Sequence, residues 1–430
     1  MLTPTPILIA DLASQPAAVG DAAQATRDLL DWAVQADSPS RLQGFLDKGA
    51  DPQAVDSNGH SALMRAIRKG NFRKALAVLP LSDADHRVSR QEAPLALALA
   101  LRDPARLVAG ISAPTPSFLA DLALFLASSE QNAPSAQHWE LIALAAIRDD
   151  DAETLEKIAS HCDLRGGVVV RGRHASFLAI AAAETAPKSV SFLLTTGSDP
   201  MARDAEGANA LMALAARGAP QASSRDATPP VAARYAQNPI DDERALECAR
   251  LLLGACDTEA QDQEGRTALM LAASHAWWGI FRLIAAKSDV NVQSTADGST
   301  VLMRVIGHVG VRPENKQRRG YKEEQVLAIQ ALAPRADFSL RDHSGFTTIQ
   351  WALESRVGSE NDRWRNLEAL LVSMSPADAA IAAHAILVHQ MPLAAPILEA
   401  AQLHGVIQSA SPPVAPNARA AKPARALRRV

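Results

Sequence analysis

Apolar runs of helical length recur along this chain, and each follows a short polar segment that contains a glycine. Gly265 and Gly298, for example, lie 33 residues apart, and each leads into an apolar run such as TALMLAASHA. Five polar segments share the pattern D-x-x-G with some variation, and they begin at Asp56, Asp204, Asp262, Thr295 and Asp342. Apolar residues at helical spacing after a turn signal predict a turn followed by helices in each unit. A fixed period predicts a stacked array of such units.

The period is interrupted at two places. From Gly207 the next glycine of the pattern is 58 residues away, which is 25 more than the period. From Gly298 it is 47 residues away, which is 14 more than the period. We expect the extra residues to form loops after the first helix of the unit, at about 218–242 and 309–322, because their composition is loop-like. His174 takes the glycine position of an earlier unit, 33 residues before Gly207.

The polar segments contain the residue types that a turn and a helix start require. Glycine tolerates a positive φ and Asp bonds nearby backbone groups, so together they predict a turn. A Ser, Thr or Asn two residues after the glycine position is expected to cap the following helix. These capping residues are Ser61, Asn209, Thr267, Thr300 and Thr347.

The repeated pattern resembles the ankyrin repeat family over roughly residues 26–375. The resemblance implies a β-turn or hairpin followed by two antiparallel helices in each unit. It therefore implies an all-α fold, an α-solenoid of about eight or nine stacked helix–turn–helix repeats with short β-turn connections. The family usually has Pro and His where this chain has the Ala and the Met of its A-L-M motif. The methionines expected to fill that space as flexible apolar side chains are Met64, Met212, Met270 and Met303.

The order of strong, faint and absent repeat signals predicts six segments. They are a flexible N-terminus (1–25), N-terminal ankyrin repeats (26–90), degenerate helical repeats (91–172), C-terminal ankyrin repeats (173–375), capping helices (376–405) and a disordered basic tail (406–430). Each unit exposes an apolar face unless a neighbour covers it, so an array needs caps at its ends. The final segment is rich in Pro, Ala and basic residues, which is typical of disorder.

The composition agrees with stacked helices. Hydrophobic residues make up 48% of the 430 residues, but only 6 Trp, 2 Tyr and 9 Phe are present, so the apolar side chains are mostly Ala, Val, Ile and Leu. Small side chains let helices approach closely, and the abundance of apolar residues argues against a disordered chain. The formal net charge of −4 gives no support to a general role in binding nucleic acids or membrane surfaces.

The cysteines and the start of the chain bear on the compartment. Cys162, Cys248 and Cys256 form no CxxC pair and do not suggest a disulfide framework, which fits a reducing compartment. The sequence has no run of 18 apolar residues and no secretory signal at its start, so we expect no transmembrane helix. A cytoplasmic protein is the main expectation. The Pro-containing first residues are also compatible with an effector that is secreted without a cleavable signal peptide.

The sequence contains no motif of a familiar catalytic or nucleotide-binding type, because P-loop, GxGxxG, GxSxG and HExxH patterns are all absent. His161 and Cys162 are neighbours in sequence, but adjacency is not the geometry of a nucleophile and its base, so a loop or core position is expected. Gly166 and Gly167 predict a wide hairpin between units and not a phosphate loop. The other two cysteines lack the companions of a metal site. We therefore expect a non-enzymatic protein without a cofactor or metal.

The resemblance implies that the chain binds another protein through a concave face, which the turn tips and the exposed positions of the first helices form. The turn-tip candidates are Ser57, Asn58, Glu206, Gln263, Glu264, Asp297, His343 and Ser344. The helix candidates are Arg68, Lys69, Arg217, His275, His308 and Glu354. An ordinary solvated surface is the alternative for each of these residues.

A second candidate surface follows from the two long loops, which interrupt their units at the same point and so fall along one edge of a stacked array. Aromatic residues lie near that point in the sequence, and the ones expected to cluster there are Tyr235, Trp277, Trp278, Tyr321 and Trp364. Aromatic residues are favoured as interface anchors. The alternative is that they only cover helix ends. The remaining tryptophans, expected to pack inside, are Trp32, Trp139 and Trp351.

The sequence therefore predicts a non-enzymatic scaffold for protein–protein interaction. Two narrower functions stay open: an immunity-type inhibitor that blocks an enzyme of its own cell, and a secreted bacterial effector that captures a host protein. The Ala- and Arg-rich composition suits a bacterium of high GC content. Four basic residues lie within 315–322, but Glu323 and Glu324 follow them directly, so nucleic acid is not an expected partner.

Overall fold

The computed structural model of the chain is built mainly from helices. It describes residues 17–35, 38–82, 94–102, 113–129, 132–170, 172–216, 239–275, 277–307, 321–354, 360–375, 377–379 and 382. Of these residues 58% are helical and 4% are in strands, which agrees with the predicted all-α class. The chain divides into two compact units, Met1–Gln263 and Glu264–Val430.

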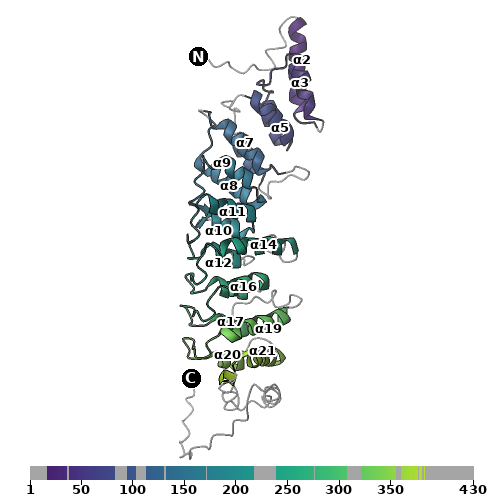
Figure 1. Cartoon of the computed structure of the whole chain (residues 1–430). Helices are drawn as coiled ribbons and strands as arrows, with labels where there is room; N and C mark the ends of the chain where they lie inside the picture. The colour runs from purple at the N-terminus through teal and green to yellow at the C-terminus, as the bar shows by residue number, and fades with distance from the viewer. Residues whose placement is uncertain are drawn as a thin grey trace, which may run out of the picture. The chain divides into compact units, whose positions relative to one another are not determined.

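Helices of the first unit pack in two layers (Figure 1). In one layer, each of the following helices packs on the next: α4 (Ala62–Arg68), α6 (Pro94–Ala100), α8 (Ala136–Asp149), α10 (Phe177–Ala183) and α12 (Ala210–Ala215). In the other layer the order is α5 (Phe72–Val78), α7 (Pro116–Leu126), α9 (Ala152–Ile158), α11 (Pro187–Thr195) and α14 (Pro239–Leu252). Each helix of the first layer also packs against the helix that follows it in the chain.

The second unit repeats this arrangement with fewer helices. One layer consists of α15 (Ala268–Ser274), α17 (Val301–Gly307) and α20 (Thr348–Glu354). The other consists of α16 (Trp278–Ala285), α19 (Tyr321–Leu332) with its 3-10 extension η3 (Ala333–Arg335), and α21 (Glu360–Ser373). In this unit a turn leads from α16 to α17 and from η3 to α20.

The N-terminal end is helical earlier than the sequence suggested. Helix α2 (Ala17–Trp32) packs against α3 (Leu42–Leu46), which follows the 3-10 helix η1 (Pro39–Arg41), and against α4. The predicted flexible N-terminus is therefore wrong from residue 17 onward. The reason is that this Ala-rich segment has a face to bury, because Ala23 and Ala25 are covered by the chain.

Small and aliphatic side chains form the core of both units. The leucines of the A-L-M motif, at most 3% exposed, are Leu63, Leu211, Leu269 and Leu302. The adjacent methionines, at most 1% exposed, are Met64, Met212, Met270 and Met303. Trp32 and Trp139 are buried, as expected, whereas Trp351 is partly exposed.

One buried cation joins the first two helix pairs. Lys74, on α5 before its 3-10 extension η2 (Leu79–Leu81), is only 3% exposed. Its ammonium group donates to the carbonyl oxygens of Trp32 at 2.6 Å and Gln35 at 2.9 Å, and it lies 4.5 Å from the centre of the Trp32 ring. The lysine thus supplies further hydrogen-bond donors to carbonyls at and just beyond the C-terminal end of α2.

The predicted helix caps are present. The side-chain oxygen of each predicted residue accepts the backbone N–H three residues further on; these residues are Ser61, Asn209, Thr267, Thr300 and Thr347. Caps of this kind depend on local sequence alone, which is why the pattern was sufficient to find them.

The hairpin expected near Gly167 is present, but it is longer than the other turns. Strand β1 (Gly167–Val170) pairs antiparallel with β2 (Arg173–Ser176). Ser176 caps α10 two residues after His174, which is the spacing predicted for the glycine position, and His174 itself lies in β2 opposite Val169. Gly172, two residues earlier, has the positive φ of 78° that the tip of this hairpin requires.

The two predicted loops end earlier than expected, because α14 already begins at Pro239 and α19 at Tyr321. Proline at the first helical position and acidic residues just after it favour this start for α14. The remainder of both loops lies outside the described residues. So do the basic tail (406–430) and all of the capping segment 376–405 except 377–379 and 382.

Gly298 and Gly345 have similar positive φ angles but differ in how close the next turn lies. Substituting each by Ala therefore separates the free-energy cost of a steric clash from the cost of backbone strain. Gly298 has a φ of 71°, and a Cβ atom there would lie 2.8 Å from the backbone nitrogen of His343. Gly345 has a φ of 84°, and the described residues place nothing within 4 Å of its Cβ position. We expect Gly345→Ala to lower the free energy of unfolding by about 1–2 kcal/mol through strain alone. Gly298→Ala is expected to cost about 1–3 kcal/mol more. Urea denaturation of the two variants measures the difference, and equal losses would contradict the packing described here.

Candidate functional site

The turns are connected to one another by backbone hydrogen bonds. In the first unit, the N–H of Ala205 donates to the carbonyl of His174 at 3.2 Å, and the N–H of Gln263 donates to the carbonyl of Glu206 at 2.9 Å. In the second unit, the N–H of His343 donates to a carbonyl of the preceding turn, that of Asp297, at 2.9 Å. Each of these bonds fixes the position of one turn against the next.

Within each regular turn, one aspartate orders the backbone. The Oδ1 atoms of Asp56, Asp204 and Asp342 each accept two backbone N–H groups, from the residues two and four positions further on, at 2.8–3.0 Å. These bonds satisfy donors that the tight turn leaves without a backbone partner. The side chains at the tip are therefore held on an ordered backbone.

A side chain from the following helix stabilises the same aspartate in two of the turns. The residue nine positions after the Asp carries a donor in each case: Trp351 donates from Nε1 to Oδ2 of Asp342 at 2.8 Å, and Nε of Arg65 lies 3.8 Å from Oδ2 of Asp56. The residue nine positions after Asp204 is Ala213, and the one nine positions after Asp262 is Leu271. Neither side chain has a hydrogen-bond donor. The turns therefore differ in how firmly they are attached to their helices.

The turn before α17 is one residue longer than the others. In the regular turns the glycine lies eight positions after an earlier Asp, as Gly59 does after Asp51, whereas Gly298 lies nine positions after Asp289. Correspondingly, the N–H of Gly298 donates to the carbonyl four residues back, that of Ser294, at 2.8 Å. The extra residue places Thr295 and Ala296 at the exposed tip of this turn.

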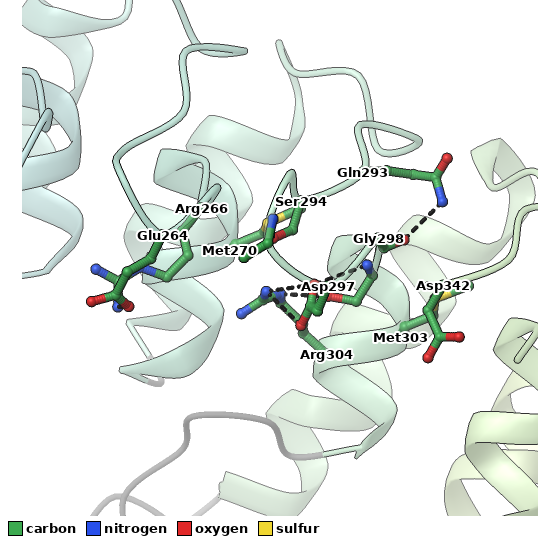
Figure 2. Close-up of polar contacts among 12 residues, drawn as sticks. Glu264, Arg266, Met270, Gln293, Ser294, Asp297, Gly298, Met303, Arg304 and Asp342 are labelled. Atoms are coloured by element: carbon green, nitrogen blue, oxygen red, sulfur yellow. Dashed lines mark hydrogen bonds and ion pairs between the residues drawn. The ribbon is translucent and has the colours of Figure 1, made fainter. Parts of the chain in front are cut away.

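Arg304 on α17 stabilises this longer turn (Figure 2). Its guanidinium group bonds both carboxylate oxygens of Asp297, at 3.1 and 3.0 Å, and donates from Nε to Oγ of Ser299 at 2.8 Å. Ser299 in turn donates its hydroxyl to Asp297 at 2.7 Å. The Arg304 side chain is 8% exposed and that of Asp297 is 43% exposed, so this ion pair is partly shielded from solvent.

The surroundings of Asp297 favour its charged form. Partial burial raises the pKa of this carboxyl group, but the side-chain and backbone hydrogen bonds from Ser299 and the positive charge of Arg304 outweigh that effect. Its pKa therefore lies below the ordinary value. On the far side of the turn, the Gln293 amide donates to the carbonyl of Gly298 at 2.7 Å (Figure 2). It also donates to the carbonyl of Arg341, in the next turn, at 2.7 Å.

Most of the predicted turn-tip residues lie at exposed positions. These are Ser57, Asn58, Gln263, Glu264, His343 and Ser344. Glu206 and Asp297 are half-buried and form ion pairs with Arg173 and Arg304, respectively. Thr295 and Ala296 were not predicted as tip residues, although the longer spacing between Asp289 and Gly298 was a signal that could have found them.

Three of the six predicted helix positions have side chains that the structure describes. Arg68 and Lys69 are exposed, and a guanidinium nitrogen of Arg68 lies 2.7 Å from Nε2 of His60. His275 is half-buried. Arg217 and His308 lie outside the described residues, and Glu354 belongs to α20 but its side chain is outside them as well.

The aromatic edge stays a prediction. Trp277 precedes α16 and Trp278 begins it, and both are half-buried; the Trp278 ring lies edge-on to Phe281 with 5.5 Å between the ring centres. Tyr235 lies outside the described residues. Tyr321 and Trp364 belong to α19 and α21, but their side chains are not among those described.

The thiols of Cys162 and Cys256, which could in principle act as nucleophiles, lie in surroundings that keep them protonated. Burial and nearby acidic residues raise the pKa of the Cys162 thiol to about 11, and burial raises that of Cys256 to about 11 as well. Both are therefore largely uncharged near neutral pH, whereas a reactive cysteine is a thiolate. In the segments that the structure describes, no three His, Cys, Asp or Glu side chains are grouped as metal ligands. The helices of those segments also include none that is long and apolar enough to cross a membrane.

Comparison with known proteins adds no relative, because neither a protein-family model nor a curated protein sequence matches this chain. The features that bear on function are therefore those of the molecule itself: a series of ordered turns, connected by backbone bonds, with exposed side chains at their tips.

The role of Arg304 can be tested against a neighbouring arginine. Arg304→Met removes three hydrogen bonds to Asp297 and Ser299, and we expect it to lower the free energy of unfolding by about 1–3 kcal/mol. Arg282→Met is the matched control, because the Arg282 side chain is 54% exposed and forms its ion pair with Glu324 near solvent. Its expected cost is within about 0.5 kcal/mol. Urea denaturation measures both, and a loss for Arg304→Met as small as that of the control would contradict the stabilising role.

Proposed function

We propose that this protein is a non-enzymatic scaffold of ankyrin type that binds a protein partner through its turn tips. The observation that carries the proposal is that the tip side chains are exposed while hydrogen bonds order the backbone of the turns that carry them. Ser57, Asn58, Glu264 and His343 are exposed. The Asp56 side chain holds the turn of Ser57 and Asn58. A backbone bond to the preceding turn holds the segment that leads to Glu264, and the turn of His343 has both kinds of bond.

Order at the tips favours binding for an energetic reason. A flexible loop loses conformational freedom when it binds, and that loss opposes association. A turn whose backbone donors are already bonded in the free protein has less freedom to lose. The side chains at its tip can therefore contribute more of their interaction energy to affinity.

The architecture of the helices supports the same proposal. Turns followed by two helices, with first and second helices in separate layers, are what the resemblance to ankyrin repeats implies. Such arrays usually bind other proteins through their turn tips and first helices. The helices keep the neighbouring turns of each unit at a fixed spacing, so several tips of one unit can contact one partner at the same time.

The proposal is tested with a variant that removes only tip side chains. Ser57, Asn58, Glu264 and His343 are replaced together by Ala, and wild-type and variant chains are immobilised to capture proteins from extracts of the source cells. A captured protein is then purified and titrated against each chain. We expect the tip variant to bind at least about tenfold more weakly, which corresponds to about 1.4 kcal/mol.

A matched control replaces four exposed residues on the second-layer helices, Glu247, Arg250, Gln330 and Glu368, by Ala. This control is expected to bind like the wild type. Circular dichroism and urea denaturation check that both variants are folded. Equal affinity of the tip variant and the wild type, or loss of binding only in the control, would overturn the proposal, as would the absence of any partner bound with micromolar affinity.

A further inference from the structure

The turn from Arg203 to Gly207 shows how two consecutive turns fit together. A guanidinium nitrogen of Arg203 donates to the carbonyl of Gly207 at 2.8 Å and to the carbonyl of Gln261, on the next turn, at 2.6 Å. Two residues after Gln261, the N–H of Gln263 donates to the carbonyl of Glu206 at 2.9 Å. The segment that packs against this turn thus supplies the carbonyl of Gln261 and, two residues later, the N–H of Gln263.

The side chain of Gln263 adds a third bond, because its amide donates to the carbonyl of Ala205 at 2.9 Å. The two backbones are close, since a Cβ atom on Gly207 would lie 3.2 Å from the nitrogen of Gln263. Glycine is therefore required at this position both for its positive φ and for the approach of the next turn.

The turn from Arg341 to Gly345 has the same internal structure. Arg341 donates to the carbonyl of Gly345 at 2.8 Å, as Arg203 does to Gly207. The regular aspartate, Asp342, orders the backbone between them. Every group that receives the next turn in the first example therefore has an equivalent here.

The two turns differ in one respect: among the described residues, no further turn packs against the turn from Arg341 to Gly345. Nothing lies within 4 Å of the Cβ position of Gly345. Among the described residues, no donor bonds the carbonyl of Ser344 and no second acceptor bonds Arg341. Arg341, His343, Ser344 and Gly345 are all exposed. The sequence after Gly345 contains no further D-x-x-G pattern, so it does not offer another turn of the same kind.

We propose that this open edge, formed by Arg341, His343, Ser344 and Gly345, binds an extended segment of a partner protein. The segment places a backbone carbonyl against Arg341 and, two residues later, a backbone N–H against the carbonyl of Ser344. A Gln side chain at that second position bonds the carbonyl of His343. Exposed edges with unpaired backbone groups are templates for pairing with another chain, and main-chain bonds supply much of the affinity.

The charge of the edge indicates the composition of the segment. Arg341 is positively charged and exposed. The segment that occupies the equivalent site in this chain, residues 257–264, contains four acidic residues and no basic one. The favoured ligand is therefore an acidic, Gln-containing extended peptide. This inference holds whether or not the turn tips bind a partner. The edge uses the Arg341 side chain and backbone carbonyls, including that of His343, whereas the tips act through their side chains.

The test uses a cyclised peptide with the sequence of residues 257–267, DTEAQDQEGRT, as the probe. Binding to the full chain is followed by saturation-transfer difference NMR, which detects weak complexes. We expect a dissociation constant on the order of 1 mM, the range for a few hydrogen bonds set against the costs of association. The strongest signals are expected from the Gln-Asp-Gln protons.

Two matched controls make the test specific. A peptide methylated on the backbone nitrogen that corresponds to Gln263 cannot donate to Ser344, and we expect it to bind about fivefold or more weakly. Arg341→Ala is expected to weaken binding similarly, whereas Arg203→Ala, in the turn whose edge is already occupied, is expected to leave it unchanged.

Three results would overturn the proposal. The first is that the unmodified peptide does not bind the full chain. This result is expected if other residues of the chain cover the edge. The second is equal binding of the methylated and unmethylated peptides. The third is concentration-dependent dimerisation in sedimentation that Arg341→Ala abolishes, because the occupant is then a second copy and not a partner peptide.

Discussion

The hydrogen bond between the backbones of consecutive turns is the interaction on which the surface of this protein depends. Turns expose backbone groups that need partners, and this chain supplies them in two ways: the aspartate of each regular turn accepts its inner N–H groups, and the neighbouring turn accepts or donates at its edge. Glycine at the contact lets the two backbones approach, as Gly207 and Gly298 do. Because the register of the turns is fixed in this way, the spacing of their tip side chains is fixed as well.

The helix layers carry these turns through contacts of a second kind, in which a cation bonds the carbonyls of a neighbouring helix pair. Lys74 bonds carbonyls at the end of α2, and Arg335 bonds those of Ala285 and Ser288 at the end of α16, each at 2.5 Å. Both cations supply donors to carbonyl groups at or just beyond a helix end, where the helix has few donors of its own. Stability in such an array is close to a sum of contacts between neighbours, so the loss of one contact weakens one junction and leaves the others in place. This separation allows the turn tips to vary in sequence without loss of the fold.

The sequence was informative wherever the determining interaction is local. The caps at Ser61 and Thr267 and the buried A-L-M residues follow from spacing within a few residues of each other, and both were predicted. The longer turn at Asp297 and the role of Arg304 were missed, because they depend on one extra residue and on a contact between a turn and its helix. Helix α2 was predicted to start too late because its Ala-rich face becomes apparent only when α3 and α4 cover it. The open edge at Gly345 was also beyond the sequence, since it is defined by comparison with an occupied edge in three dimensions.

Amide hydrogen exchange at single-residue resolution tests most directly whether bonds between turns fix the surface. The amides of Ala205, Gln263 and His343 belong to turns at the surface but donate to neighbouring turns. The amide of Ser57 has the corresponding position in its own turn, and within the described residues no acceptor bonds it. We expect the three bonded amides to exchange at least about 100-fold more slowly than Ser57, after correction for intrinsic rates. Exchange of all four at similar rates would contradict the account, because it would mean that the turns move independently of one another.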